Sequence, residues 1–129
     1  ASGSDAIFGP AQLQKLLFLI DREIPTLVDG PIFHFQPYDY GPFDSNVYDS
    51  INELEILGSA AVDHSGRYRT YSLTEQGYRE GRIILEQMQQ NAQEYLVSAS
   101  QWVRSVSFQE MVSAIYKKYP DMKANSIFK

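Results

Sequence analysis

The chain contains no cysteine among its 129 residues, which excludes a disulfide-stabilised scaffold and a thiolate metal site. Long apolar runs are also missing. The longest run in the first half, from Leu16 to Ile20, is far shorter than the roughly 20 residues of a membrane-spanning helix. The first residues lack the basic segment and adjoining apolar core of a secretory signal. These absences predict a cytoplasmic protein that crosses no membrane.

Positive charge is absent from a long stretch in the first half of the chain. No lysine or arginine lies between Arg22 and Arg67, whereas the same stretch contains Glu23, Asp29, Asp39, Asp44, Asp49, Glu53, Glu55 and Asp63. Residues 1–66 carry two basic and ten acidic side chains (net −8), and residues 67–129 carry nine basic and six acidic side chains (net +3). Because carboxylates repel phosphates, we expect any contact with nucleic acid to come from the second half.

Patterns typical of enzymes and metal centres are missing as well. The two histidines, His34 and His64, lie far apart and lack the paired spacing of a metal-binding helix. No serine occupies a G-x-S-x-G turn, and the glycines are scattered rather than gathered in a phosphate-binding loop. We therefore predict no catalytic residue, no metal and no cofactor, and a protein that is not an enzyme.

Hydrophobic spacing and turn residues predict one mainly helical α+β domain over residues 1–129, in which residues 1–4 are interpreted as a cloning remnant. The expected elements are a helix over 10–24, a short strand or extended segment over 32–35, a helix over 45–57, strands over 60–63 and 68–73 joined as a hairpin, a long helix from Thr74 past Gln90, and a helix over 108–119 behind a capping box at Ser107. This order is typical of a winged helix-turn-helix with a C-terminal helical extension over 98–129.

Two segments of the chain carry a family resemblance. Lys15-Leu16-Leu17-Phe18-Leu19-Ile20-Asp21, followed by Tyr40-Gly41-Pro42-Phe43 and Val47-Tyr48, resembles the SocA-like family, also called Panacea, and small bacterial proteins of the YwgA type. The segment from Tyr71 to Gly77 is similar to the end of the wing in many winged-helix regulators. The resemblance covers residues 10–80 and implies an antitoxin or proteolytic adaptor that binds a protein partner. Phe43 and Asp44, after the Gly-Pro step, depart from the family pattern.

The predicted helix over residues 45–57 occupies the position of a DNA-recognition helix. We expect its buried stripe to be Val47, Ile51, Leu54 and Leu57. Its outward positions include Asp49, Glu53 and Glu55. Proteins contact DNA mainly through basic and amide side chains, so the acidic helix favours a basic protein partner. The alternative interpretation is a solvated helix exterior that binds nothing.

Aromatic residues are concentrated between positions 33 and 48, and three of them lie in the predicted connector: Tyr38, Tyr40 and Phe43. Exposed tyrosines beside carboxylates are typical anchors of protein interfaces. We therefore predict that these three residues extend the protein-binding surface of the acidic helix. Packing in the core is the alternative for the same side chains.

Arg67 and Arg69 flank Tyr68 in the predicted hairpin and are the best candidates for a nucleic-acid contact. Residues two apart share a strand face, so both side chains are expected to project together towards DNA. The alternative function is thus a dimeric DNA-binding regulator that pairs through residues 75–96. Two arginines neutralise few phosphates. The competing interpretations are that these arginines only keep the hairpin soluble, or that Arg69 packs on Tyr71.

Overall fold

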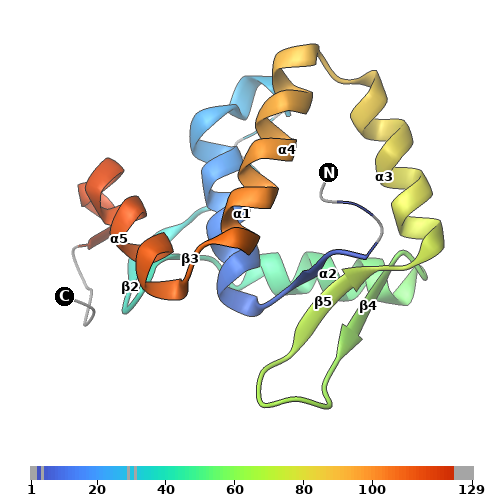
Figure 1. Ribbon diagram of the computed structural model, residues 1–129, viewed down its shortest axis with the longest axis horizontal. Helices are drawn as coiled ribbons and strands as arrows, with labels where there is room; N and C mark the ends of the chain where they lie inside the picture. The colour runs from blue at the N-terminus through green and yellow to red at the C-terminus, as the bar shows by residue number, and fades with distance from the viewer. Residues whose placement is uncertain (1–2, 4, 29, 31, 124–129) are drawn as a thin grey trace.

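The computed structural model describes residues 3, 5–28, 30 and 32–123. The proposed cloning remnant, apart from Gly3, and the part of the extension beyond Lys123 lie outside the described residues. Within the described part, five α-helices surround two small antiparallel sheets (Figure 1). None of these helices is long and apolar enough to cross a membrane. The predicted class, α+β and mainly helical, is confirmed.

The elements follow the chain in a simple order. They are β1 (Ile7–Phe8), α1 (Pro10–Glu23), β2 (Gln36–Tyr38), β3 (Gly41–Phe43), α2 (Asn46–Ile56), β4 (Ala60–Asp63), β5 (Thr70–Leu73), α3 (Glu75–Gln87), α4 (Gln90–Ser105) and α5 (Phe108–Lys118), with 3-10 turns at Pro25–Leu27 and Pro120–Lys123. The predicted positions of α1, α2, the β4–β5 hairpin and α5 are confirmed within a few residues.

The larger sheet has the strand order β1-β5-β4. β4 and β5 form an antiparallel hairpin in which Ala60 lies opposite Leu73 and Asp63 lies opposite Thr70. β1, which the sequence analysis missed, pairs with the other edge of β5 and places Phe8 opposite Tyr71. A two-residue strand is too short to carry an alternating pattern, so the sequence gives no local signal for it.

The single long helix predicted from Thr74 past Gln90 is wrong. Thr74 caps α3 as expected, since its Oγ1 accepts a hydrogen bond from the Gly77 N–H at 3.1 Å. However, α3 ends at Gln87, because Met88 and Gln89 adopt extended backbone with ψ values of 160° and 150°. The chain reverses there into α4 (Figure 1). The helical spacing of apolar residues continues across the turn, and no glycine or proline marks the break.

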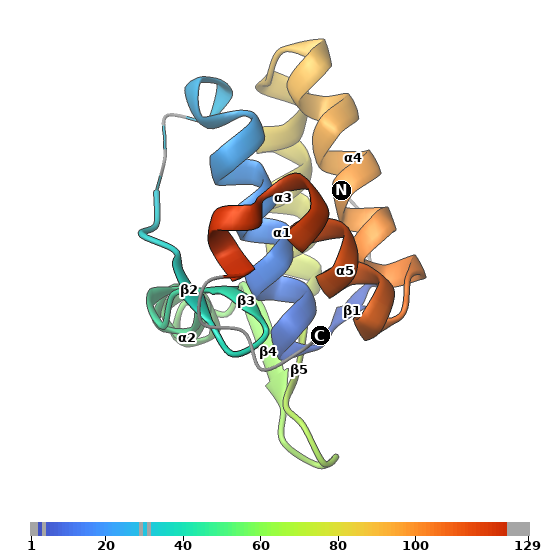
Figure 2. The ribbon, with the colours of Figure 1, turned by 90° about the vertical axis from the view of Figure 1, so that its left-hand side faces the viewer.

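The main core lies where α1, α4 and α5 meet (Figure 2). At its centre Phe18 of α1 is 1% exposed, and the rings of Phe35 and Tyr119 pack edge-on against it at 5.5 Å and 5.1 Å. α5 begins where it was predicted, because the Ser107 Oγ accepts a hydrogen bond from the Glu110 N–H at 3.1 Å. A smaller cluster around Val47 and Tyr71 joins α1 and α2 to the sheet.

Candidate protein-interaction surface

The connector, defined here as residues 32–44, is held by its own two-stranded sheet and by buried side chains of α1. Residues 32–35, predicted to be a short strand or an extended segment, do not form a strand, because pairing starts only at Gln36, where β2 meets β3. The buried Asp21 carboxylate of α1 instead accepts hydrogen bonds from the Ile32 N–H at 3.1 Å and the Phe33 N–H at 2.7 Å. Two backbone donors that a strand would have paired are thus satisfied by one side chain.

The far end of the connector is fixed by two more buried side chains of α1. The Gln14 amide donates to the Asp44 carbonyl at 2.9 Å and accepts from the Asp44 N–H at 3.0 Å. The Lys15 Nζ donates to the Pro42 carbonyl at 3.3 Å. The Asp44 carboxylate in turn accepts from the His34 N–H at 2.8 Å and the Asn46 N–H at 2.9 Å, which joins the connector to the start of α2.

The aromatic residues of the connector form a continuous row with α2 and β5. The ring of Tyr38 lies 5.1 Å from Phe43, Phe43 lies 6.1 Å from Tyr48, and Tyr48 stacks on Tyr71 at 6.1 Å. Tyr38 remains 56% exposed at the outer end of this row, while Tyr71 is buried. Both interpretations of these aromatic residues, core packing and an exposed binding surface, therefore hold in part. The row packs into the core at Tyr71 and leaves the Tyr38 ring exposed at its other end.

Tyr40 lines the same hollow as Tyr38, Phe43 and Tyr48, and it also contacts α5. Its ring packs edge-on against Phe108 of α5 at 5.4 Å, and both residues are partly exposed. The structure thus brings Tyr38 and Phe43 towards α2, whereas it places Tyr40 beside α5.

The three acidic candidates on α2 divide between two sides of the helix. Asp49 and Glu53 are exposed and lie one helical turn apart. Glu55 is also exposed, but six residues separate it from Asp49, which places it roughly 120° around the helix axis. The structure therefore groups Asp49 with Glu53 and separates Glu55 from them.

The C-terminal end of α2 exposes two apolar side chains, and the sequence analysis did not predict this exposure. Leu57, predicted to be buried, is 69% exposed, and Ile56 is 83% exposed. The predicted stripe is correct at Val47, which is fully buried, but the core that covers Val47 does not extend to the end of the helix. Helical spacing identifies a face but not how far the neighbouring elements cover it. We name the exposed set Asp49, Glu53, Ile56 and Leu57 the α2 row.

Both candidate arginines lie in the loop between β4 and β5 rather than in a strand, so strand alternation does not set their directions. The Arg67 guanidinium lies 5.4 Å from the Tyr68 ring centre. The Arg69 guanidinium lies 5.5 Å from the Tyr48 ring centre and 6.0 Å from that of Tyr71. The predicted packing of Arg69 on Tyr71 is confirmed, and it ties Arg69 to the aromatic row.

In the part of the chain that the structure describes, no group of three or more histidine, aspartate or glutamate side chains is arranged to hold a metal ion. His34 lies in the connector and His64 in the β4–β5 loop, and both are exposed.

The family model described as "Antitoxin SocA-like, Panacea domain" matches residues 13–129. A search of the curated proteins and a search of the solved structures each gave no match. The matched range extends past the resemblance noted over residues 10–80 and contains the connector, the α2 row and the helices that follow the hairpin.

Removal of the Asp21 carboxylate tests whether it holds the connector. Asp21→Ala leaves two backbone N–H groups without their acceptor, so we expect the free energy of unfolding to fall by about 2–4 kcal/mol. Amide hydrogen exchange at Ile32 and Phe33 is expected to accelerate. Asp49→Ala, at an exposed carboxylate, is the control, and its cost is expected to stay below about 1 kcal/mol. Equal losses in the two variants would contradict the anchoring role.

The buried Lys15, which donates to the Pro42 carbonyl, gives a second test of how the connector is held, through the pH dependence of stability. Burial lowers the pKa of Lys15 to about 8, against 10.5 for an ordinary lysine. Between about pH 8 and 9.5 the unfolded chain keeps this proton and the folded chain releases it, so stability is expected to rise by about 2 kcal/mol. Lys15→Met removes this titration. Denaturant unfolding of both proteins across this range is expected to show the rise in the wild type alone, and parallel pH profiles would contradict it.

Proposed function

Because this chain belongs to the antitoxin SocA-like (Panacea) family, we propose that it is a non-enzymatic, antitoxin-like module that binds a protein partner through the α2 row and the adjoining connector. The observation that supports this site is the juxtaposition of exposed apolar and acidic side chains on one helix. Ile56 and Leu57 are the two most exposed large apolar side chains among the described residues, and Asp49 and Glu53 lie beside them.

The chemistry of the α2 row defines the kind of partner. Apolar side chains that become fully covered supply most of the binding energy of an interface, and charges around them select the partner and speed association. Since the stretch between Arg22 and Arg67 has no cation, the partner segment that fits is basic and amphipathic. A purely solvated helix face would not need two exposed aliphatic residues at its end.

The connector extends this surface. The exposed ring of Tyr38 packs on Phe43, and Phe43 packs on Tyr48. The ring is therefore already ordered, so little side-chain entropy is lost when a partner covers it. Tyr40, which packs on Phe108 of α5, and Glu55, on another side of α2, are proposed as peripheral contacts.

Charge reversal on the α2 row tests the proposal. The probe is the protein encoded next to this chain in its genome, co-produced with it and measured by titration calorimetry. We expect Asp49→Lys with Glu53→Lys to weaken binding at least about 30-fold, and Ile56→Ala with Leu57→Ala to weaken it similarly. Glu94→Lys with Glu110→Lys makes the same charge change at exposed sites on other helices. Its effect is expected to stay within about threefold.

Two outcomes of this titration would contradict the proposed site. The first is an equal loss in the two charge-reversal variants, which would mean that only total charge matters. The second is full binding by both α2 variants, which would place the partner elsewhere. Glu55→Lys alone is expected to have a smaller effect than Glu53→Lys, because it lies on another side of the helix.

A DNA-binding regulator is the second candidate function. In this proposal the β4–β5 hairpin, which projects from the body in Figure 1, is the wing of a winged helix-turn-helix, and a homodimer through residues 75–96 doubles the number of arginines. It is favoured by the exposure of Arg67 and Arg69. It is weakened by the acidic α2 and by the contact of Arg69 with Tyr48 and Tyr71.

A gel shift on duplex DNA at about 50 mM salt decides the second candidate. If DNA is bound, Arg67→Ala with Arg69→Ala is expected to abolish the shift, while the matched change Arg79→Ala with Arg82→Ala on α3 leaves it in place. A wild-type protein that gives no shift at this salt concentration would exclude the candidate.

A further inference from the structure

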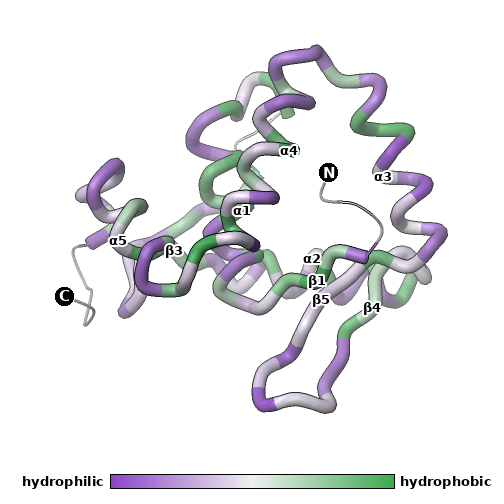
Figure 3. Tube along the Cα trace, viewed as in Figure 1, coloured by the Kyte–Doolittle hydropathy of each residue, from purple (hydrophilic) through white to green (hydrophobic). Residues whose placement is uncertain are grey.

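α3 is attached to the rest of the protein mainly at its beginning. Gly77 packs so closely against β4 that an added Cβ would lie 1.8 Å from the Ser59 carbonyl oxygen. Beyond this point α3 rises away from the sheet, and its path stands apart from α1 and α4 until the turn at Met88 (Figure 1). The strongly apolar residues of α3 gather in the half nearer the turn into α4 (Figure 3).

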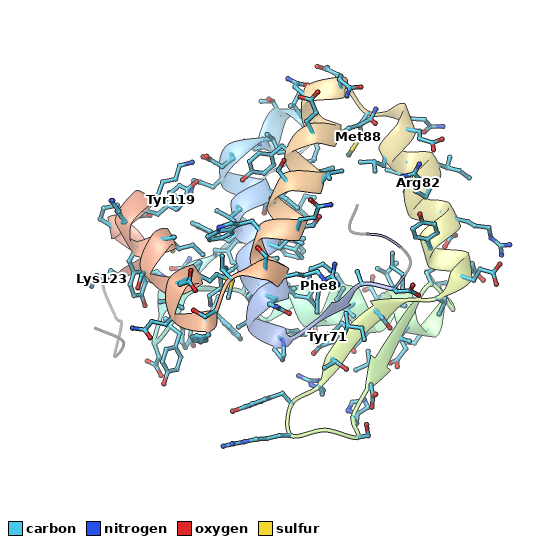
Figure 4. All side chains as sticks on the ribbon, viewed as in Figure 1. Phe8, Tyr71, Arg82, Met88, Tyr119 and Lys123 are labelled. Carbon is cyan, nitrogen blue, oxygen red and sulfur yellow. The ribbon has the colours of Figure 1, made fainter. Side chains whose placement is uncertain are left out.

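An apolar groove of about 330 Å³ lies between α3 and the body. Its walls come from α1, α2, α4, the larger sheet and α3, and include Leu13, Leu16, Tyr71, Ile84, Leu85 and Met88. Figure 4 shows Met88 at one end of this space, and Phe8 and Tyr71 towards the other. None of the described residues that line the groove is charged, so a segment that fills it must be apolar on the side that enters.

The α3 wall of the groove contains both a projection and a gap. Gly81, Ile84, Leu85 and Met88 line the groove and recur at the spacing of one helix face. Ile84 is 58% exposed, while an added Cβ at Gly81 would meet nothing within 4 Å. A glycine inside a helix costs about 1 kcal/mol relative to alanine, and no neighbour in this chain requires one at position 81. Such a gap permits the close approach of a second helix.

We propose that this face is a homodimer interface, in which α3 of a second copy of the chain packs antiparallel against the groove across a two-fold axis. Such an interface must be complementary to itself. Here the projecting Ile84 and the gap at Gly81 lie three residues apart on one helix, so each copy offers the projection that the other copy's gap accepts. In the dimer, α3 of each copy thus forms one wall of its own groove and packs against the groove of the other copy.

The charges of α3 permit a second copy on this face. Outside the stripe, α3 carries Glu75, Arg79, Glu80, Arg82 and Glu86, which sum to −1. Four of them form two exposed ion pairs, Arg79 with Glu75 at 3.7 Å and Arg82 with Glu86 at 3.1 Å. Because these charges nearly cancel, two copies of α3 repel each other only weakly. Two copies of the acidic α2 row would repel each other, so that row is left for another partner.

Two neighbouring isoleucines provide a matched test. Ile83 and Ile84 are both 58% exposed, but only Ile84 lines the groove, and Ile83 lies about 100° further around the helix. Ile84→Glu places a charge against the uncharged groove, whereas Ile83→Glu makes the same change away from it. Circular dichroism spectra check that both variants keep their helices.

Sedimentation equilibrium from about 1 µM to about 200 µM measures the dimer. We expect the wild type and Ile83→Glu to reach twice 14.7 kDa, and Ile84→Glu to dissociate at least about 30-fold more readily. Gly81→Leu, which fills the gap, is expected to behave like Ile84→Glu. The α2-row variant Asp49→Lys with Glu53→Lys is expected to remain dimeric, so failure of the proposed partner site and failure of this interface give different results.

Several results would overturn the homodimer. A wild type that stays monomeric over the whole concentration range overturns the homodimer. In that case, loss of partner binding in Ile84→Glu would assign the groove to the protein partner. A dimer that survives Ile84→Glu, or that Ile83→Glu disrupts equally, overturns the assignment of the interface to the groove side of α3.

Discussion

The connector depends on hydrogen bonds from one face of α1, and the candidate surface depends on the connector. Residues 32–44 include Pro37 and Pro42, which cannot donate to a sheet, so the segment cannot be held by strand pairing alone. Buried Gln14, Lys15 and Asp21 instead bond its backbone. Burying these polar groups is costly unless each finds its partner, so only one path of the connector satisfies them. That path places Tyr38 and Phe43 beside α2.

The same contacts give a physical meaning to the family resemblance. Lys15 and Tyr40-Gly41-Pro42 are far apart in the sequence, and the structure joins them through the bond from the Lys15 Nζ to the Pro42 carbonyl. Lys15 and Pro42 of the motif therefore record how the connector is anchored. Asp44, which departs from the family pattern, is part of the same anchor, because its carboxylate accepts from the backbone N–H groups of His34 and Asn46.

Sequence patterns predicted elements whose signals are local. Pro10, Thr74 and Ser107 mark the starts of α1, α3 and α5, and alternation identified the β4–β5 hairpin. The predictions that were wrong depend on contacts between residues that are far apart in the sequence. The turn at Met88 continues the helical spacing on both sides, and Leu57 fits a buried stripe that the rest of the protein does not cover. The acidic half of the α2 row was visible in the sequence, whereas Ile56 and Leu57 became candidates only when their exposure was known.

The proposed partner site and the proposed dimer interface differ in electrostatic sign and in apolar shape. The α2 row joins aliphatic side chains to uncompensated carboxylates, so a partner gains from burying the former only if it also brings positive charge. The groove beside α3 has uncharged walls, and the charges of α3 outside the groove nearly cancel, so the groove selects for shape rather than charge. Because α2 and α3 carry these features on separate elements, occupation of one surface does not require the other to be empty. A dimer formed through α3 would therefore present two α2 rows, and a partner with two basic segments would bind it more tightly than either row alone.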